Sequence, residues 1–362
     1  MSFQYLRIAE TVRRKILNMS TPPLVLVTGV TGFLGSHVVY QLLEAGYRVR
    51  GIARSSKVSM AQEGYAAYGD KYEVVPFDDL VGGDFSNIVK GVSAVIHVAA
   101  PLAGRADRAE AIRVAVEGNL NILRAAEKVG VKRFAFASSI ITVVSPSGSM
   151  TDQNWNQGTK KQALDESSDA MFVYGVAKTI SERAIWDFVE KHPDIDATTV
   201  NPPYFIGPFA LGFRAPDGAI SAMSSNELIY RLLQPDWEVN AFGRTVDVRD
   251  VARGLVNALK APTNVGRKRI LMSGEWFSWK DAVEFIAAER PELKLRLAAS
   301  AFKAVPAPPT AIDNTRAKEV LGLEMTPWKT SVLDAVDSLV QLEKEWIKKG
   351  LTIRDLYPRW DV

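Results

Sequence analysis

The sequence predicts an α/β fold, a doubly wound parallel sheet followed by a smaller mixed α/β domain. Short apolar strands alternate with helical patterns through the first 200 residues, which indicates parallel strands joined by crossover helices. A glycine-rich turn joins the first strand to the first helix. Beyond residue 203 the alternation fades into short helices and Pro-rich turns such as residues 305–309, which predicts a separate smaller domain.

The individual elements follow from hydrophobic periodicity. Short apolar runs predict buried strands, and apolar residues spaced by three or four predict helices. The predicted strands are residues 24–27, 48–53, 72–76, 94–99, 134–138 and 197–200. The predicted helices are residues 36–45, 105–129, 173–188, 247–260 and 331–348, and the polar residues 145–170 predict a long surface loop.

Composition excludes several classes of function. The 362 residues contain no Cys, so disulfides, thiolate-bound metals and cysteine nucleophiles are excluded, and three scattered His make a metal site unexpected. The net charge is +3 without a basic run, so we expect no nucleic-acid partner. No apolar stretch approaches membrane-spanning length, so we expect no membrane association and a cytoplasmic location. A monomer and a homodimer both remain open.

The glycine-rich turn predicts dinucleotide binding. Gly29 permits a tight turn, Gly32 lets the backbone approach a pyrophosphate, and Gly35 allows close packing of helix on strand. The helix start then offers N–H groups and a positive dipole end to the phosphates. The cofactor-binding residues predicted in this turn are Gly29, Thr31, Gly32, Phe33, Leu34 and Gly35.

The end of the second strand indicates NADPH. NAD-binding folds carry an acid there for the ribose 2′-hydroxyl, whereas this chain has Arg54 at that point and Lys57 shortly after it. A guanidinium can make paired hydrogen bonds to a 2′-phosphate. We therefore predict that Arg54 and Lys57 bind NADPH. The three parts of the chain are then an N-terminal extension (1–22), a Rossmann-type NADP-binding domain (23–202, with 241–262 returning to it) and a substrate-binding domain (203–240 and 263–362).

A catalytic pair is predicted on the helix that follows the fifth strand. Tyr174 and Lys178 are four residues apart and therefore share a helix face. A nearby cation lowers the pKa of a phenol and makes it a usable acid or base. The fifth strand ends in Ser138 and Ser139, at the sheet edge where such folds bind ligands. A hydroxyl there can stabilise an oxyanion.

In these motifs the chain resembles an extended short-chain dehydrogenase/reductase, in the branch of dihydroflavonol reductases, cinnamoyl-CoA reductases and methylglyoxal-reductase-like ketoreductases. The motifs cover about residues 23–350 in the expected order. They are VTGVTGFLGSHVV at 27–39, GIARSS at 51–56, DL at 79–80, HVAAP at 97–101, FASS at 136–139, YGVAK at 174–178, NPPYFIGP at 201–208 and DVRDVA at 247–252.

The resemblance implies an NADPH-dependent carbonyl reductase with Ser139, Tyr174 and Lys178 as its catalytic residues. Hydride would pass from the nicotinamide C4 to an aldehyde or ketone, with Tyr174 as the proton donor. The further cofactor contacts that the resemblance implies are Asp79, Leu80, Ala99, Ala100, Pro101, Pro202, Pro203, Tyr204 and Ser225. Pro203 departs from many relatives, and the asparagine of the sugar-epimerase relatives is missing, so Asn119 and Asn121 are left out of the catalytic set. His97, within the fourth strand, is expected to be a core residue.

A substrate pocket is expected between the sheet edge and residues 203–240. Its candidate walls are Leu102, Ile140, Ile141, Tyr204, Phe209, Phe213, Ala222 and Met223. They are nearly all apolar, which favours a hydrophobic or aromatic small-molecule carbonyl substrate over a sugar nucleotide. Two alternatives remain: an NAD-dependent epimerase or isomerase of the same fold, and a non-catalytic dinucleotide sensor.

Overall fold

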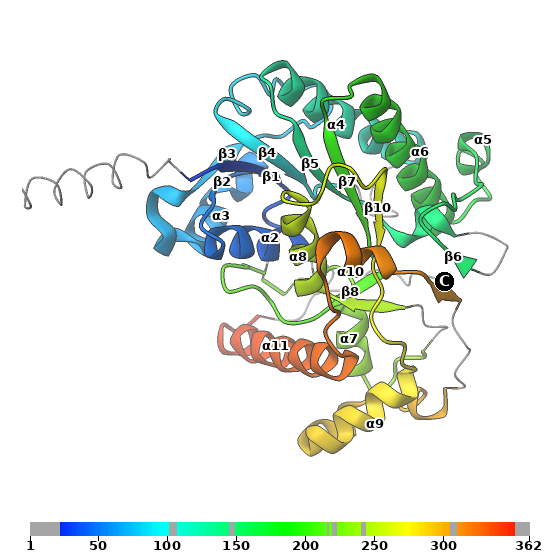
Figure 1. The fold of residues 1–362 in the computed structure, drawn as a ribbon. Helices are drawn as coiled ribbons and strands as arrows, with labels where there is room; N and C mark the ends of the chain where they lie inside the picture. Colours follow the sequence, from blue (N-terminus) through cyan, green and yellow to red (C-terminus); the bar gives the residue numbers. More distant parts are fainter. Residues whose placement is uncertain are drawn as a thin grey trace, which may run out of the picture.

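The computed structural model describes residues 22–100, 107–144, 149–215, 217–218, 223–239, 244–304 and 310–351. Its centre is a seven-stranded sheet in the order β10-β7-β5-β4-β1-β2-β3, with every strand pair parallel (Figure 1). The strands are β1 (Leu24–Thr28), β2 (Arg48–Ala53), β3 (Tyr72–Pro76), β4 (Val92–His97), β5 (Arg133–Ala137), β7 (Asp196–Asn201) and β10 (Lys268–Leu271). The predicted fold class is therefore confirmed.

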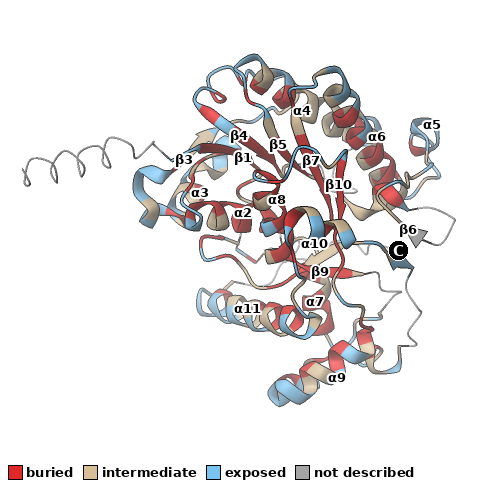
Figure 2. Ribbon diagram, viewed as in Figure 1, coloured by how far each residue is buried: buried red, intermediate tan, exposed pale blue. Residues whose placement is uncertain are grey.

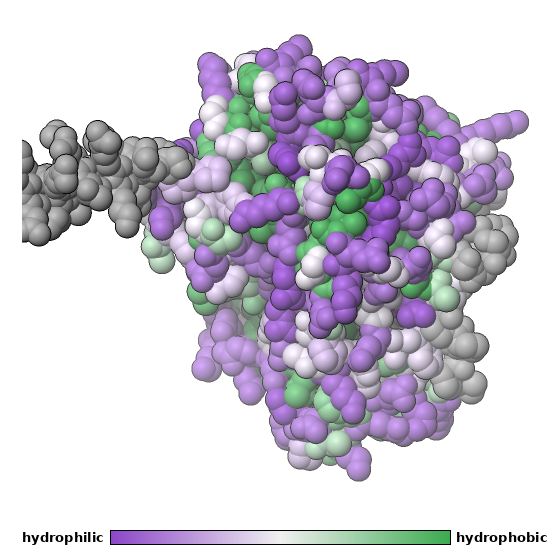
Figure 3. Space-filling view, viewed as in Figure 1, coloured by the Kyte–Doolittle hydropathy of each residue, from purple (hydrophilic) through white to green (hydrophobic). Residues whose placement is uncertain are grey.

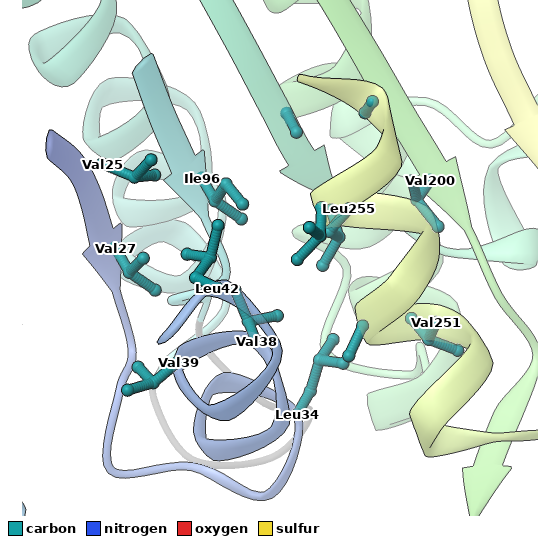
Figure 4. Packing of buried hydrophobic residues seen from close by; sticks show 14 of the residues in the cluster. Val25, Val27, Leu34, Val38, Val39, Leu42, Ile96, Val200, Val251 and Leu255 are labelled. Atoms are coloured by element: carbon teal, nitrogen blue, oxygen red, sulfur yellow. The ribbon is translucent and has the colours of Figure 1, made fainter. Parts of the chain in front are cut away.

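Helices cover both faces of this sheet. Val25 and Val27 of β1 pack with helices α2 (Phe33–Glu44) and α8 (Val248–Ala258) in one core, which Figure 4 shows from close by. Leu26 points to the opposite core, with α4 (Arg108–Lys128) and α6 (Ala170–Lys191). Both faces of the central strands are thus apolar because both are covered, and these strands are drawn mostly in the colour of buried residues in Figure 2.

A second, smaller core lies beyond the carboxyl edge of the sheet, below it in Figure 1. It is built mainly from three helices and a short parallel pair of strands. These elements are β8 (Tyr204–Ile206), β9 (Thr245–Asp247), α7 (Asn226–Leu232), α9 (Trp279–Glu289) and α11 (Trp328–Lys348). The remaining short elements are α3 (Val58–Gly64), α5 (Lys160–Ala163), α10 (Thr315–Leu321), β6 (Ser149–Met150) and β11 (Ala311–Ile312).

Three features of the fold differ from the sequence prediction. Residues 263–362, expected in the smaller domain, include β10 at the edge of the large sheet. This strand was missed because it begins with two charged residues, Lys268 and Arg269, which are buried through ion pairs with Asp196 and Glu182. The predicted loop 145–170 contains β6 and α5, and helix α2 begins at Phe33, three residues earlier than expected.

One face of the molecule is mostly polar at its surface (Figure 3). The face in Figure 3 is largely hydrophilic, with hydrophobic side chains in scattered spots. No helix within the described ranges has both the length and the apolar character needed to cross a membrane. Of the predicted N-terminal extension, residues 1–21 lie outside the described part of the chain.

Candidate active site

The glycine-rich turn between β1 and α2 leaves no room for a side chain at Gly29 or Gly35. Gly29 has a φ of 71°, and a Cβ there would lie 2.9 Å from the Ala99 backbone nitrogen. A Cβ on Gly35 would lie 2.0 Å from the Gly29 carbonyl oxygen. Helix α2 starts behind Gly32 without a side-chain cap, so its first N–H groups can serve a phosphate. This geometry fits the pyrophosphate of a dinucleotide.

Two residues of the turn reach a cofactor only through their backbone. The Phe33 side chain is 2% exposed and stacks on Phe205, with ring centroids 6.0 Å apart. Leu34 is equally buried in the core beside α8. Thr31 is half-buried and lies within the turn itself.

The loops after β2 and β3 lie side by side. Arg54 is exposed directly after β2, followed by the half-buried Lys57. The sequence shows no acid at the end of β2, but the structure brings one there from β3. The Asp78 carboxylate accepts the Ser55 N–H at 2.8 Å and also the Ser55 hydroxyl. Sequence reasoning missed this neighbour, although Asp78 directly precedes the Asp79–Leu80 motif.

The other predicted cofactor residues border the same edge of the sheet. Asp79 holds its own loop, because its Oδ1 accepts the N–H groups of Val81 and Gly82 at 2.8 and 3.0 Å. One pocket at this edge reaches from Leu80 of the Asp79–Leu80 motif to the predicted catalytic lysine. Its lining includes Leu80, Ala99, Ala100, Ala137 and Lys178.

The three predicted catalytic side chains come together beside this pocket. The Ser139 hydroxyl is hydrogen-bonded to the Tyr174 phenol. Lys178 Nζ lies 6.0 Å from the centre of the Tyr174 ring and donates to the Ala137 carbonyl at 3.1 Å. Gly175 permits this arrangement, since a Cβ there would lie 3.1 Å from Ile141.

Burial dominates the protonation of this group. It raises the pKa of Tyr174 to about 12, although the Ser139 hydrogen bond acts in the opposite direction. The expected lowering of the phenol pKa by the nearby cation is outweighed here, because burial of Tyr174 gives a net raised pKa. Burial also lowers the pKa of Lys178 to about 8, against the attraction of Glu182. Tyr174 therefore keeps its proton at neutral pH, the form that can act as an acid.

A buried ion pair of Glu182 with Arg269 lies beside the predicted catalytic residues. Glu182, one helical turn after Lys178, is 1% exposed and accepts from Arg269 Nε at 2.6 Å and Asn201 Nδ2 at 2.7 Å. It also accepts from the hydroxyl of Ser138. Glu182 thus ties α6 to β7, to β10 and to the end of β5. Sequence reasoning missed this pair, because Glu182 and Arg269 are 87 residues apart in the chain.

The loops after β5 and β7 are also joined. The Ile140 N–H donates to the Pro202 carbonyl at 2.9 Å. Pro202 is buried, and Pro203 and Tyr204 are half-buried beside it. The predicted cofactor contact Ser225 uses its hydroxyl on the Phe205 backbone, donating to the carbonyl at 2.7 Å and accepting from the N–H at 3.1 Å. Its side chain therefore fastens β8 to the start of α7.

Part of the predicted substrate pocket is core. Phe213 is 9% exposed and packs with Phe209 against Phe33, and Met223 is fully buried in the smaller core. Phe213 and Met223 therefore pack as core residues in this structure, and their place in the wall of a substrate pocket stays a prediction. Ile140, Ile141 and Tyr204 are half-buried, as is Phe209. Pro101, Leu102 and Ala222 lie outside the described residues.

His97 is a core residue, as expected. Its Nδ1 lies 3.1 Å from the Thr28 hydroxyl, and burial lowers its pKa to about 3. The imidazole is therefore neutral beside Lys178. Among the described residues, no three His, Asp or Glu side chains gather into a group that could hold a metal ion.

Comparisons with known proteins give one consistent result. Residues 25–274 match the model of the NAD dependent epimerase/dehydratase family. An oxidoreductase of Schizosaccharomyces pombe is 35% identical over 282 residues, covering 74% of this chain and 82% of the relative. The ketoreductase azaE of Aspergillus niger is 30% identical over 337 residues, covering 88% and 97%. The structure of the yeast methylglyoxal/isovaleraldehyde reductase Gre2 complexed with NADPH has a TM-score of 0.78 at 25% identity, covering 89% and 99%.

Proposed function

The chain belongs to the NAD dependent epimerase/dehydratase family, and from that premise we propose that it is an NADPH-dependent carbonyl reductase. One observation carries the proposal: the half-buried, protonated Tyr174 phenol meets Ser139 beside Lys178. These three residues lie at the carboxyl edge of the sheet, the same edge as the glycine-rich turn. The ketoreductase and the NADPH-bound reductase among its relatives support the same activity. The family resemblance predicted from the motifs is thereby confirmed.

NADPH, when bound, supplies the hydride for the carbonyl carbon. Tyr174 donates its proton to the carbonyl oxygen, and general acid catalysis of this kind contributes roughly 10²–10⁴-fold. The Ser139 hydroxyl donates a hydrogen bond to the same oxygen and orients it. Lys178 places a cation beside the phenol and stabilises the phenolate that remains.

The binding of NADPH rests on two parts of the chain. The turn at residues 29–35 and the start of α2 fit the pyrophosphate. In this proposal the exposed Arg54, directly after β2, binds the 2′-phosphate. The half-buried Ile140, Ile141 and Tyr204 beside the catalytic group favour a hydrophobic or aromatic carbonyl compound. A cytoplasmic location and the oligomeric state stay predictions.

The test replaces the proton donor. Tyr174→Phe should lower turnover by roughly 10²–10⁴-fold while NADPH still binds, measured by NADPH consumption with aromatic aldehydes and β-ketoesters and by cofactor fluorescence. The control is Tyr68→Phe, because the Tyr68 hydroxyl bonds Glu44 in another part of the fold. Unchanged turnover in the Tyr174 variant would remove this residue from its role. Tightly retained NAD in purified protein, without net turnover, would favour an epimerase instead.

A further inference from the structure

We propose that Asp78 sets the nucleotide preference of this site, opposing the 2′-phosphate of NADPH and accepting the ribose 2′-hydroxyl of NADH. The inference rests on the proposed function, since it concerns the cofactor of the same site. With Asp78 in this role, the enzyme prefers NADPH only moderately and can use NADH as a second cofactor.

The sheet register brings Asp78 to this position. Strands β2 and β3 are parallel, and Ala53 pairs with Pro76. The pairing continues one residue further, because the Phe77 N–H donates to the Ala53 carbonyl at 2.8 Å. Asp78 therefore follows β3 at the level where Ser55 follows β2.

The Asp78 carboxylate already binds hydrogen-bond donors that a phosphate could use. One oxygen of Asp78 accepts the Ser55 N–H at 2.8 Å, and the other accepts the Ser55 hydroxyl. These bonds, together with the attraction of Arg54, hold the pKa of Asp78 below its usual range, so the group is ionised at neutral pH. A backbone N–H, a hydroxyl and a guanidinium are also the donors that a ribose 2′-phosphate requires.

The two cofactors meet Asp78 in opposite ways. The 2′-phosphate of NADPH brings a second anion to Arg54 and Ser55, and must share or displace the bonds that the carboxylate already makes. The 2′-hydroxyl of NADH is a donor, and NAD-binding folds use a carboxylate at the end of β2 as its acceptor; Asp78 brings a carboxylate beside that point from the loop after β3. A single exposed charge thus disfavours one cofactor and favours the other.

The chain offers a matched control a few residues further on. Asp84 accepts the N–H and the hydroxyl of Ser86, both at 2.8 Å, in the same two-bond arrangement. The cation that lowers the pKa of Asp84 is Lys90, not Arg54. Asp84→Asn therefore changes the net charge by the same amount and alters the same pair of bonds to a serine, here within a single loop.

The experiment measures binding without substrate. Dissociation constants of NADPH, NADH, 2′,5′-ADP and 5′-AMP are determined by calorimetry for the wild type, Asp78→Asn and Asp84→Asn. The amide of Asp78→Asn can still accept the Ser55 N–H. The bond between the loops after β2 and β3 is therefore retained while the charge is removed. We expect NADPH and 2′,5′-ADP to bind about threefold more tightly in Asp78→Asn. NADH should bind about three- to tenfold more weakly, and Asp84→Asn should leave every constant within about twofold.

Each other outcome has a definite meaning. Weaker binding of NADPH to Asp78→Asn would show that Asp78 only holds the loops after β2 and β3 together. That result would overturn the inference. An equal shift in Asp84→Asn would assign the effect to net charge and overturn it as well. Wild-type protein that binds NADPH but reduces no carbonyl compound would overturn the proposed function alone, since the binding ratios still decide the role of Asp78. Protein that binds neither dinucleotide would overturn both.

Discussion

The two ends of the cofactor site are built in opposite ways. At the catalytic end, Tyr174 and Lys178 are half-buried, and the fully buried Glu182 lies one helical turn beyond Lys178. At the adenosine end, Arg54 and Asp78 are exposed on the loops after β2 and β3. Proton transfer needs groups held in one position away from water, which costs desolvation free energy. Choosing a nucleotide needs only a local excess of charge, which exposed groups supply at little cost to the fold.

The largest effect is expected from breaking the buried ion pair. Arg269→Met leaves the Glu182 carboxylate buried without its guanidinium, and should lower the free energy of unfolding by about 3–5 kcal/mol, measured by urea denaturation. The matched control is its neighbour, Arg267→Met, because the pair of Arg267 with Glu190 is exposed. That control should cost less than about 1 kcal/mol.

The double variant sharpens this result. Adding Glu182→Gln to Arg269→Met removes the unpaired charge and should recover part of the lost stability. Equal costs for Arg269→Met and Arg267→Met would contradict the contrast between a buried catalytic end and an exposed surface.

The next effect concerns the adenosine end. Arg54→Ala should weaken NADPH binding by about 10–100-fold at low salt, since a charge-assisted contact to a phosphate is lost, and should change NADH binding little. The difference between wild type and variant should shrink as salt screens the exposed charge. Titrations at two ionic strengths measure it.

Arg48→Ala is the control for Arg54, because Arg48 stands at the other end of the same strand. An equal loss of NADH and NADPH binding in Arg54→Ala would show that Arg54 supports the whole adenosine and not the 2′-phosphate. Unaltered binding of both would move the phosphate site away from β2.

The same contrast explains how far sequence reasoning reached. The turn at residues 29–35 and the pair Tyr174 and Lys178 are short patterns, with all their members close in the chain, and strands β2 and β3 were predicted with the bounds observed. The ion pair of Glu182 and Arg269 joins residues 87 positions apart. Nothing local distinguishes its buried charges from surface charges. Asp78 was missed because its position depends on the register of β3 against β2.

The smallest effect is a gain in stability at the catalytic end. Burial lowers the pKa of Lys178 from 10.5 to about 8, so between these values the folded chain binds fewer protons than the unfolded chain. The contribution of this group to stability therefore rises with pH across that window, and its desolvation cost is fully present at pH 7. Lys178→Met removes that cost and should raise the free energy of unfolding by about 1–2 kcal/mol at pH 7, less than the full cost because the bond to the Ala137 carbonyl is lost.

Urea denaturation at pH 7 and pH 10 tests this sign. The advantage of Lys178→Met should shrink at pH 10, where the folded wild type holds a neutral amine, and the variant should have lost its turnover. Arg54→Ala is the reference, since removing an exposed cation should leave stability within about 0.5 kcal/mol at both pH values. A lower free energy of unfolding in Lys178→Met than in the wild type would mean that favourable contacts hold the lysine. The catalytic end would then cost the fold no more stability than the adenosine end. A higher free energy of unfolding in Lys178→Met would show that the Lys178 cation serves the reaction although it destabilises the fold.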